Sequence, residues 1–174
     1  DDIICQFCTL DSDRDTEAQV EAIVQFFPQV LTRRHYMGLY PIQLLAFARN
    51  EERDWECNVS RVSFIPLVAR LAAKEFGLFE EEERGGLLCK GEHDTNVLHQ
   101  LMLNDKFDRA NVDTKYLQVL IRLRRMGLLK KEDIQNYGLL HILCREDYFI
   151  EKRFRFLVEW DPSALTQTNE YGWL

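Results

Sequence analysis

The chain has 174 residues, of which 46% are hydrophobic and 29% are charged. This composition is typical of a folded globular protein and excludes a chain that is disordered throughout. The net charge of −7 and an isoelectric point near 5.2 argue against a general nucleic-acid binder. No apolar run approaches the roughly 18 residues that a membrane-spanning helix needs, so membrane insertion is not expected.

The spacing of apolar residues predicts four pairs of helices, each a short helix followed by a longer one. No segment alternates apolar and polar residues for long enough to predict a strand. The first long helix begins at a capping-box pattern of Thr16 and Gln19 and continues with an apolar face. The pairs cover residues about 2–27, 41–76, 96–126 and 139–160, and the apolar face of the first long helix consists of Val20, Ile23, Val24 and Phe27.

Prolines and aspartates indicate where these helices begin. Pro41 suits the first position of the second short helix, and Pro66 is expected to kink the following long helix or to lie in its first turn. Asp113 is predicted to cap the third long helix and Asp147 the fourth. The remaining expectations are a short helical turn at 131–135 and irregular segments at 50–58 and 77–93.

The short helices are preceded by turn residues at a constant distance. Gly38, Asp94 and Asn136 each stand five residues before a polar residue of the next short helix. All three residue types tolerate turn or left-handed geometry. The polar residues that follow them are Gln43, His99 and His141.

One segment of the chain recurs without a gap. Residues 23–38 match residues 157–172 at a constant offset of 134. Such self-similarity is the mark of a chain that uses one supersecondary unit several times. The matched pairs include Val24 with Val158, Phe26 with Trp160, Pro28 with Pro162, Leu31 with Leu165, Thr32 with Thr166 and Gly38 with Gly172.

This organisation resembles the ankyrin repeat, in which a turn glycine, a short helix and a longer helix follow one another. Leu98-His99 and Leu140-His141 match the Leu-His of that family, and Asp161-Pro162 resembles its Asp-Pro ending. The amino-acid sequence of these segments is similar to that of uncharacterised ankyrin-like proteins of diatoms. The resemblance implies an all-α solenoid of antiparallel helix pairs, and a generic α-solenoid is the alternative. Residue 38, where that family has its turn glycine, opens the segment Gly38-Leu39-Tyr40-Pro41-Ile42-Gln43.

The chain also departs from the family pattern. Equivalent turn positions lie 56 (38 to 94), 42 (94 to 136) and 36 (136 to 172) residues apart, against a family norm of about 33, so long loops and insertions are expected. The family's threonine is replaced by Tyr40, Asn96 and Gly138, so its usual Thr–His hydrogen bond cannot form. We expect one domain over 1–174, part of a longer chain, with units of about 1–37, 38–93, 94–135 and 136–171.

Two patterns suggest a metal site, and each has a simpler explanation. Residues 11–15 begin like a calcium loop, but Thr16 and Ala22 replace the glycine and the glutamate that such a loop requires. An acidic cap on a helix N-terminus is the favoured interpretation. Cys5 and Cys8 have zinc-ligand spacing but lack a second ligand pair, so packing is favoured there as well. No metal or other cofactor is expected.

Neither catalysis nor a dedicated anion site is indicated. His99 and His141 have no nucleophile or carboxylate at a recognisable motif spacing, so the chain is not expected to be an enzyme. Basic residues gather on the last two long helices, where they indicate either a positive face for an acidic partner or, preferably, a solvated helix surface. They are Arg122, Arg124, Arg125, Lys130, Lys131, Lys152, Arg153 and Arg155.

The function that fits these observations is a non-catalytic scaffold that binds another protein through its turns and short helices. Tyrosine and arginine are favoured anchors in interfaces, and the turns are rich in such side chains. The predicted partner-binding residues are Arg33, Arg34, His35, Tyr36, Met37, Trp55, Gln167, Asn169 and Tyr171.

Three other classes remain as alternatives. They are a structural subunit packed permanently in a larger assembly, a metal-stabilised module and an enzyme. The five cysteines form an odd set without disulfide-framework spacing, which favours a reducing, intracellular compartment.

Overall fold

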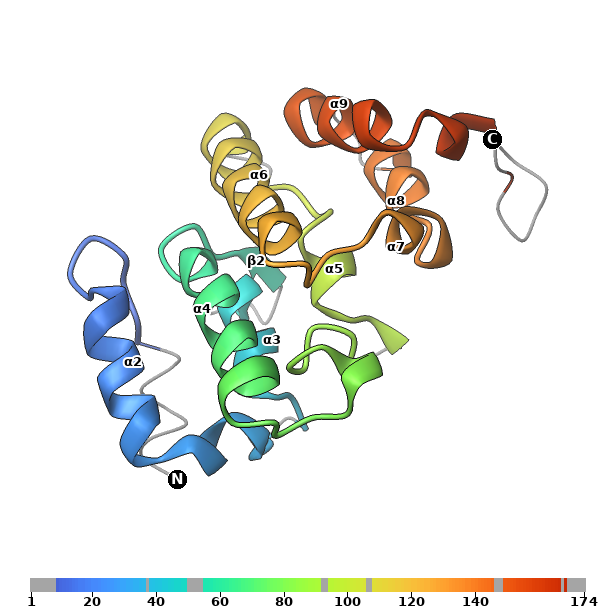
Figure 1. The fold of residues 1–174 in the computed structure, drawn as a ribbon. Coiled ribbons are helices and arrows are strands. Elements are labelled where there is room, and N and C mark those ends of the chain that lie inside the picture. The colour runs from blue at the N-terminus through green and yellow to red at the C-terminus, as the bar shows by residue number, and fades with distance from the viewer. Residues whose placement is uncertain are drawn as a thin grey trace.

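The computed structural model describes residues 9–36, 38–49, 55–91, 94–105, 108–145, 149–166 and 168. Within them the chain is mostly helical, which confirms the predicted all-α character. The long helices form a row in which neighbours in sequence contact each other, with α2 at one end and α9 at the other (Figure 1). The row consists of α2 (Glu17–Phe26), α4 (Ile65–Arg70) with the π-helical η3 (Leu71–Glu75), α6 (Arg109–Arg125) and α9 (Glu151–Trp160).

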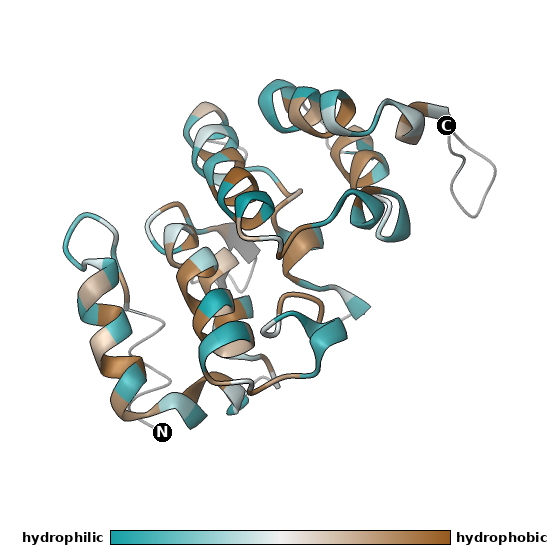
Figure 2. Cartoon of the chain, viewed as in Figure 1, coloured by the Kyte–Doolittle hydropathy of each residue, from teal (hydrophilic) through white to brown (hydrophobic). Residues whose placement is uncertain are grey.

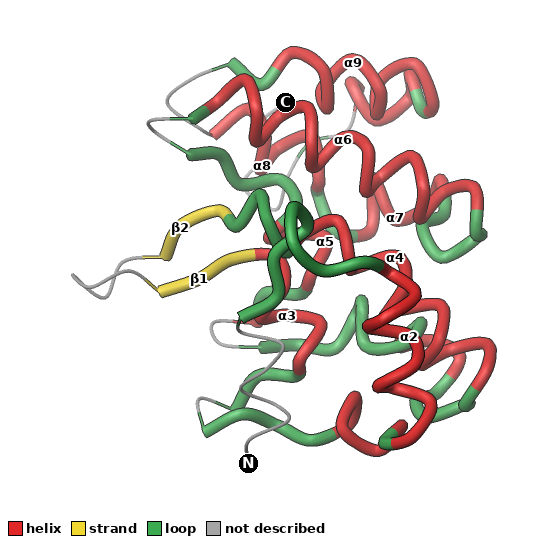
Figure 3. Tube along the Cα trace, turned by 90° about the vertical axis from the view of Figure 1, so that its left-hand side faces the viewer, coloured by secondary structure: helices red, strands yellow, loops and turns green. Residues whose placement is uncertain are grey.

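The short helices form a second row beside the first. α3 (Pro41–Ala46) contacts α5 (Val97–Gln100), which in turn contacts α8 (Leu139–Arg145) (Figure 3). α3 also packs against α4, and α8 packs against α9, so the two rows are joined along their length. A further helix, α7 (Lys131–Asn136), lies directly before α8.

The hydrophobic core lies between these two rows. Leu45, Leu98 and Leu120 come from different helices, and each is fully buried. Hydrophobic and hydrophilic residues occupy different sides of the long helices, as expected for helices with one buried face (Figure 2). The buried hydroxyl of Tyr116 donates to the carbonyl of Ala46 and accepts the N–H of Asn58 at 3.0 Å, which fixes α6 against the end of α3.

The sequence repeat at offset 134 is also a repeat of local structure. α2 ends at Phe27 and is followed by the 3₁₀ helix η1 (Pro28–Thr32), while α9 ends at Asp161 and is followed by η6 (Pro162–Thr166). Phe27 and Asp161 have φ angles of −134° and −135°. The same hydrogen bonds recur, because Thr32 and Thr166 donate through Oγ1 to the carbonyl three residues earlier at 3.1 and 2.8 Å.

Two of the predicted turns are likewise equivalent. The N–H of His35 donates to the carbonyl of Leu39, and the N–H of Gly91 donates to that of Thr95, each at 2.7 Å. Gly38 and Asp94 take positive φ angles of 77° and 58°, as their residue types predicted. Asn136 does not, because it belongs to α7, and the positive φ of the third turn falls on Gly138 instead.

A small β-hairpin contradicts the expectation that the chain has no strand. β1 (Phe47–Arg49) pairs antiparallel with β2 (Trp55–Cys57), and Ala48 lies opposite Glu56. Figure 3 shows the hairpin projecting away from the long helices. Strands of three residues are too short for a pattern of alternation to become visible in the sequence.

Several predicted boundaries need correction. α6 begins at Arg109 after Asp108, so Asp113 does not cap it. The N-cap of α9 is Ile150, and Asp147 lies outside the described residues. Pro66 occupies the first turn of α4, one of the two positions predicted for it. Two short 3₁₀ helices, η2 (Val62–Phe64) and η4 (Glu81–Glu83), complete the described elements.

The apolar face of α2 is only partly buried. Val20 and Val24 are buried as predicted. Ile23 and Phe27 were expected to face inward, yet they are 44% and 53% exposed. The reason is that the described helix packed against α2 is α4, which covers one side of it.

Candidate partner-binding surface

A groove of about 670 Å³ lies along the row of short helices, where the second turn and α5 meet α7 and α8. It includes equivalent positions of two predicted units, since Asp94 and His99 belong to 94–135 and Asn136 and His141 to 136–171, while Leu88 and Lys90 come from the predicted unit before them. Its lining mixes polar and apolar side chains. The lining residues are Leu88, Lys90, Asp94, Asn96, His99, Gln135, Asn136, Tyr137, Gly138, His141, Ile142, Arg145 and Thr168.

His99 holds the turn at the start of α5. The side chain of Asn96 accepts the N–H of His99 at 3.0 Å, and Nδ1 of His99 accepts the N–H of Asn96 at 3.2 Å. This reciprocal pair is a capping box at the start of α5. Burial lowers the pKa of His99, while a hydrogen bond with the backbone of Tyr137 opposes the shift. The ring therefore remains neutral near pH 7 and serves as a structural element of the groove wall.

The charged side chains that line the groove are exposed. Lys90 pairs with Asp94 at 3.2 Å, and both side chains are mostly exposed. His141 is half-buried and Arg145 is exposed at the other end of the lining. The arrangement offers hydrogen-bond donors, two basic side chains and an aromatic ring, which suits binding of a polypeptide segment.

The first turn presents part of its predicted set. Tyr36 is 89% exposed, and Arg33 is also exposed. Arg34 instead stabilises the turn, since its guanidinium donates to the carbonyl of Gly38 at 2.5 Å and lies 4.1 Å from the ring centroid of Tyr40. The half-buried ring of His35 lies 4.0 Å from that of Tyr36.

The first turn is linked to the second beside the groove. Nε2 of Gln43 donates to the carbonyl of Cys89 at 3.1 Å, one residue before the groove residue Lys90. The predicted residues Met37, Gln167, Asn169 and Tyr171 lie outside the described residues, as does the side chain of Trp55, whose backbone pairs with Arg49. Thr168, from the last turn, lines the groove.

None of the predicted partner-binding residues lines the groove, so sequence reasoning missed its whole lining as a binding site, including Lys90, Tyr137 and Arg145. Asp94 had been recognised only as a turn residue. The constant spacing from each turn to Gln43, His99 and His141 was the available signal, because equivalent positions of stacked units lie side by side.

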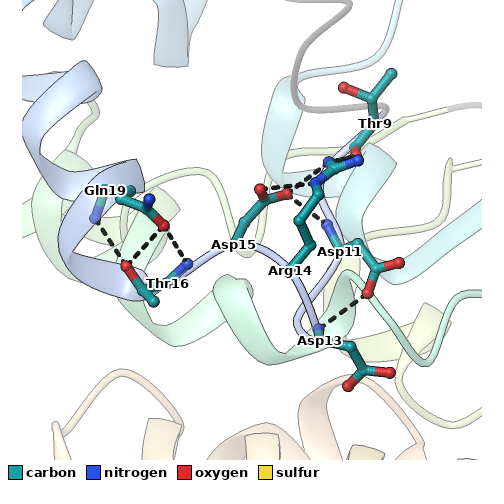
Figure 4. A network of polar contacts seen from close by, with 7 residues as sticks. All are labelled: Thr9, Asp11, Asp13, Arg14, Asp15, Thr16 and Gln19. Carbon is teal, nitrogen blue, oxygen red and sulfur yellow. Dashed lines mark hydrogen bonds and ion pairs between the residues drawn. The ribbon is translucent and has the colours of Figure 1, made fainter.

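The acidic segment before α2 forms a closed network (Figure 4). The carboxylate of Asp15 pairs with Arg14 at 2.7 Å and accepts the N–H of Asp11 at 2.9 Å. The hydrogen bond from Arg14 is the main reason that the pKa of Asp15 falls to about 2. Thr16 and Gln19 form the predicted capping box, with the N–H of Thr16 donating to Gln19 at 2.8 Å. The network therefore organises the start of α2, which supports the helix-cap interpretation.

The basic side chains of the last two long helices mostly have partners within the chain. Arg122 pairs with Glu17 at 2.5 Å, and Arg155 pairs with Glu151 at 2.7 Å. The guanidinium of Arg124 lies 4.3 Å from the ring centroid of Trp160. These contacts join or cover helices, which argues against a dedicated anion site. Arg153 is fully buried, so the solvated-surface interpretation is wrong for that residue.

Within the described residues, no group of three or more His, Cys, Asp or Glu side chains is placed to hold a metal ion. Cys5 and Cys8 lie outside that part of the chain. The search for a membrane-spanning segment, over the same residues, found no helix of sufficient length and apolarity. Comparisons of the chain with protein-family models, with curated proteins and with solved structures gave no match.

Proposed function

We propose that the chain is a non-catalytic scaffold, a solenoid of antiparallel helix pairs resembling ankyrin repeats, which binds a segment of another protein along its short helices and turns. The observation that carries this proposal is the groove of about 670 Å³ along the short helices. Its lining includes two equivalent pairs, Asp94 with Asn136 and His99 with His141, which supports a surface created by repetition of one structural unit. The neutral, turn-holding His99 and the exposed anchor Tyr36 fit a binding role.

The groove and the first turn together form an extended surface. Gln43 connects the first turn to Cys89, the neighbour of the groove residue Lys90, and Arg145 lines the same groove. A partner segment lying along it would meet exposed aromatic and basic side chains in succession. The odd set of cysteines supports a reducing, intracellular setting.

Site-specific photo-crosslinking tests this function. A photoreactive residue is placed at Tyr137 in the groove, at Tyr36 in the first turn or at Arg125, which is exposed on the long helix α6. The proposal predicts the same crosslinked protein from Tyr137 and Tyr36 and none from Arg125. An Arg145→Glu substitution should weaken the groove crosslink, since it reverses the charge of a lining residue. Equal crosslinking from all three positions would contradict the proposal.

A second candidate function is a structural subunit of a larger assembly. It is favoured by the exposed apolar side chains of Ile23, Phe26 and Phe27 at the end of the long-helix row. Native size measurement distinguishes the two functions. A structural subunit would be recovered only in one large complex of constant composition, whereas a scaffold would also be recovered alone.

A further inference from the structure

One side of α2 carries only uncharged side chains. The charged residues of this helix, Glu17 and Glu21, pair with Arg122 and Arg70. Phe26 is 79% exposed. Figure 2 shows both hydrophobic and hydrophilic residues along α2, the helix at the end of the row. The exposed residues of α2 are Ala18, Gln19, Ala22, Ile23, Gln25 and Phe26, and Phe27 follows them. We refer to these seven residues as the α2 face.

The internal repeat shows what covers the same positions in the last unit. At offset 134, Ile23 corresponds to Leu157 and Phe26 corresponds to Trp160. Leu157 is fully buried, and Trp160 is half-buried beside α6, the long helix that precedes α9 in the row. The guanidinium of Arg124, from α6, lies 4.3 Å from the Trp160 ring centroid. In the last unit, therefore, a helix with an arginine near its end packs on this stripe.

The lining of the α6–α9 contact gives the chemistry of that packing. Leu117 and Ile121 of α6 line a shallow groove together with Phe156 of α9, and Phe156 corresponds to Ala22. The helix received by α9 thus offers two aliphatic side chains one turn apart, followed by a basic residue three positions later. The α2 face has apolar and aromatic side chains at the corresponding places and small alanines that permit close approach of a helix.

Charge argues against a second copy of this chain as the occupant. Every exposed residue of α9, at the opposite end of the row, is charged, so α9 of another copy would bring Glu151, Lys152, Arg155 and Glu159 to an uncharged surface. A second α2 would offer no cation to the Phe26 ring. A helix with aliphatic residues and an arginine suits both the apolar stripe and the aromatic ring.

We propose that the α2 face is a docking site for an amphipathic helix of another protein, one that presents two aliphatic residues a turn apart and then an arginine. The aliphatic residues pack over Ala18, Ala22 and Ile23, and the arginine stacks on Phe26. This site is separate from the groove, so it holds or fails independently of the scaffold function proposed above.

A peptide with the chemistry of α6 tests the proposal. The probe is a fluorescent peptide of residues 109–126, stapled in helical form, and its binding to the intact chain is followed by anisotropy. We expect saturable binding. A Phe26→Glu substitution should weaken it by about tenfold or more, because the peptide then loses the aromatic ring that it covers when bound. Phe26 is largely exposed, so the substituted chain is expected to fold, and circular dichroism verifies this.

Two controls test whether the Phe26 ring and the arginine of the peptide contribute to binding. A Tyr36→Glu substitution, which alters an equally exposed aromatic residue in the first turn, should leave peptide binding unchanged. A peptide in which Arg124 is replaced by Glu should bind more weakly. The proposal is overturned if the peptide does not bind or if the Phe26→Glu chain binds it equally well. It is also overturned if sedimentation shows a dimer of the chain that Phe26→Glu dissociates, since a second copy would then be the occupant.

Discussion

Asp113 and Arg153 form a buried ion pair that joins the last two long helices. Nε of Arg153 donates to Asp113 Oδ1 at 3.1 Å, and the Arg153 side chain is fully buried. Asp113 also accepts the N–H groups of Lys152 and Arg153 at 3.0 and 3.2 Å. An aspartate in the second turn of α6 therefore caps the N-terminus of α9. Burial lowers the pKa of Arg153, and Asp113 opposes that shift.

Removal of the Asp113 carboxylate should destabilise the protein strongly. An Asp113→Ala substitution leaves the Arg153 guanidinium buried without its counter-ion and uncaps α9, so we expect the free energy of unfolding to fall by about 3–5 kcal/mol in urea denaturation. Glu151→Gln, at an exposed pair of the same helix, is the matched control and should cost less than about 1 kcal/mol. A double substitution, Asp113→Leu with Arg153→Met, should be more stable than Asp113→Ala alone.

Replacement of His99 by glutamine should remove a pH dependence and keep the turn. At the equivalent position of the preceding unit, Oε1 of Gln43 accepts the N–H of Tyr40 at 2.9 Å, as Nδ1 of His99 accepts that of Asn96. Burial holds the pKa of His99 below 6.5 in the folded state, so the unfolded chain takes up the proton first as the pH falls. His99 therefore contributes stability above its unfolded pKa that is lost at lower pH.

Thermal unfolding of the two proteins measures this effect. The wild-type chain should lose more stability than His99→Gln between about pH 7.5 and about pH 5.5. The other three histidines are common to both proteins, so the difference isolates His99. Identical pH profiles would show that the histidine is not held in its neutral form.

Two glycines with similar backbone angles should respond differently to alanine. Gly85 and Gly127 have φ angles of 68° and 71°. A Cβ at Gly127 has no neighbour within 4 Å, so Gly127→Ala should cost about 1 kcal/mol from backbone strain alone. A Cβ at Gly85 collides with the carbonyl oxygen of Ala69, so Gly85→Ala should cost a further 1–3 kcal/mol or so. Equal losses in urea denaturation would contradict this packing.

Cys89 should react far more slowly than Cys144 with a thiol reagent. Burial, with a hydrogen bond to Glu83, raises the pKa of Cys89 to about 12, whereas Cys144 is exposed. Only the thiolate reacts, so we expect iodoacetamide to label Cys144 at least about a hundredfold faster near pH 8. Peptide mass spectrometry over time measures both rates, and denaturant should abolish the difference.

Features that depend on residues close together in the sequence could be predicted from it. Apolar spacing located the long helices, the Thr16–Gln19 capping box was confirmed, and the recurrence of Pro28 as Pro162 corresponds to a recurrence of backbone angles and hydrogen bonds. These features depend on residues within a few positions of one another, where propensity and hydrogen bonding leave a readable signal.

Features that depend on how distant helices pack against each other could not be predicted from local sequence patterns. Asp113 has the residue type of a helix cap, but the helix it caps lies 39 residues further along the chain. Ile23 has the spacing of a core residue, but its burial depends on which sides of α2 have a neighbour. The groove is lined by residues between 88 and 168, so no single segment contains its pattern.

Amide hydrogen exchange on the complex with the crosslinked partner tests directly whether the partner binds along the short helices. It compares both rows of helices in one measurement. We expect slower exchange in residues 88–91, 94–99 and 135–142, the segments that contain most of the groove lining, and unchanged exchange in the exposed turns of α6 and α9. Slower exchange confined to the long helices, with none at the groove, would contradict it.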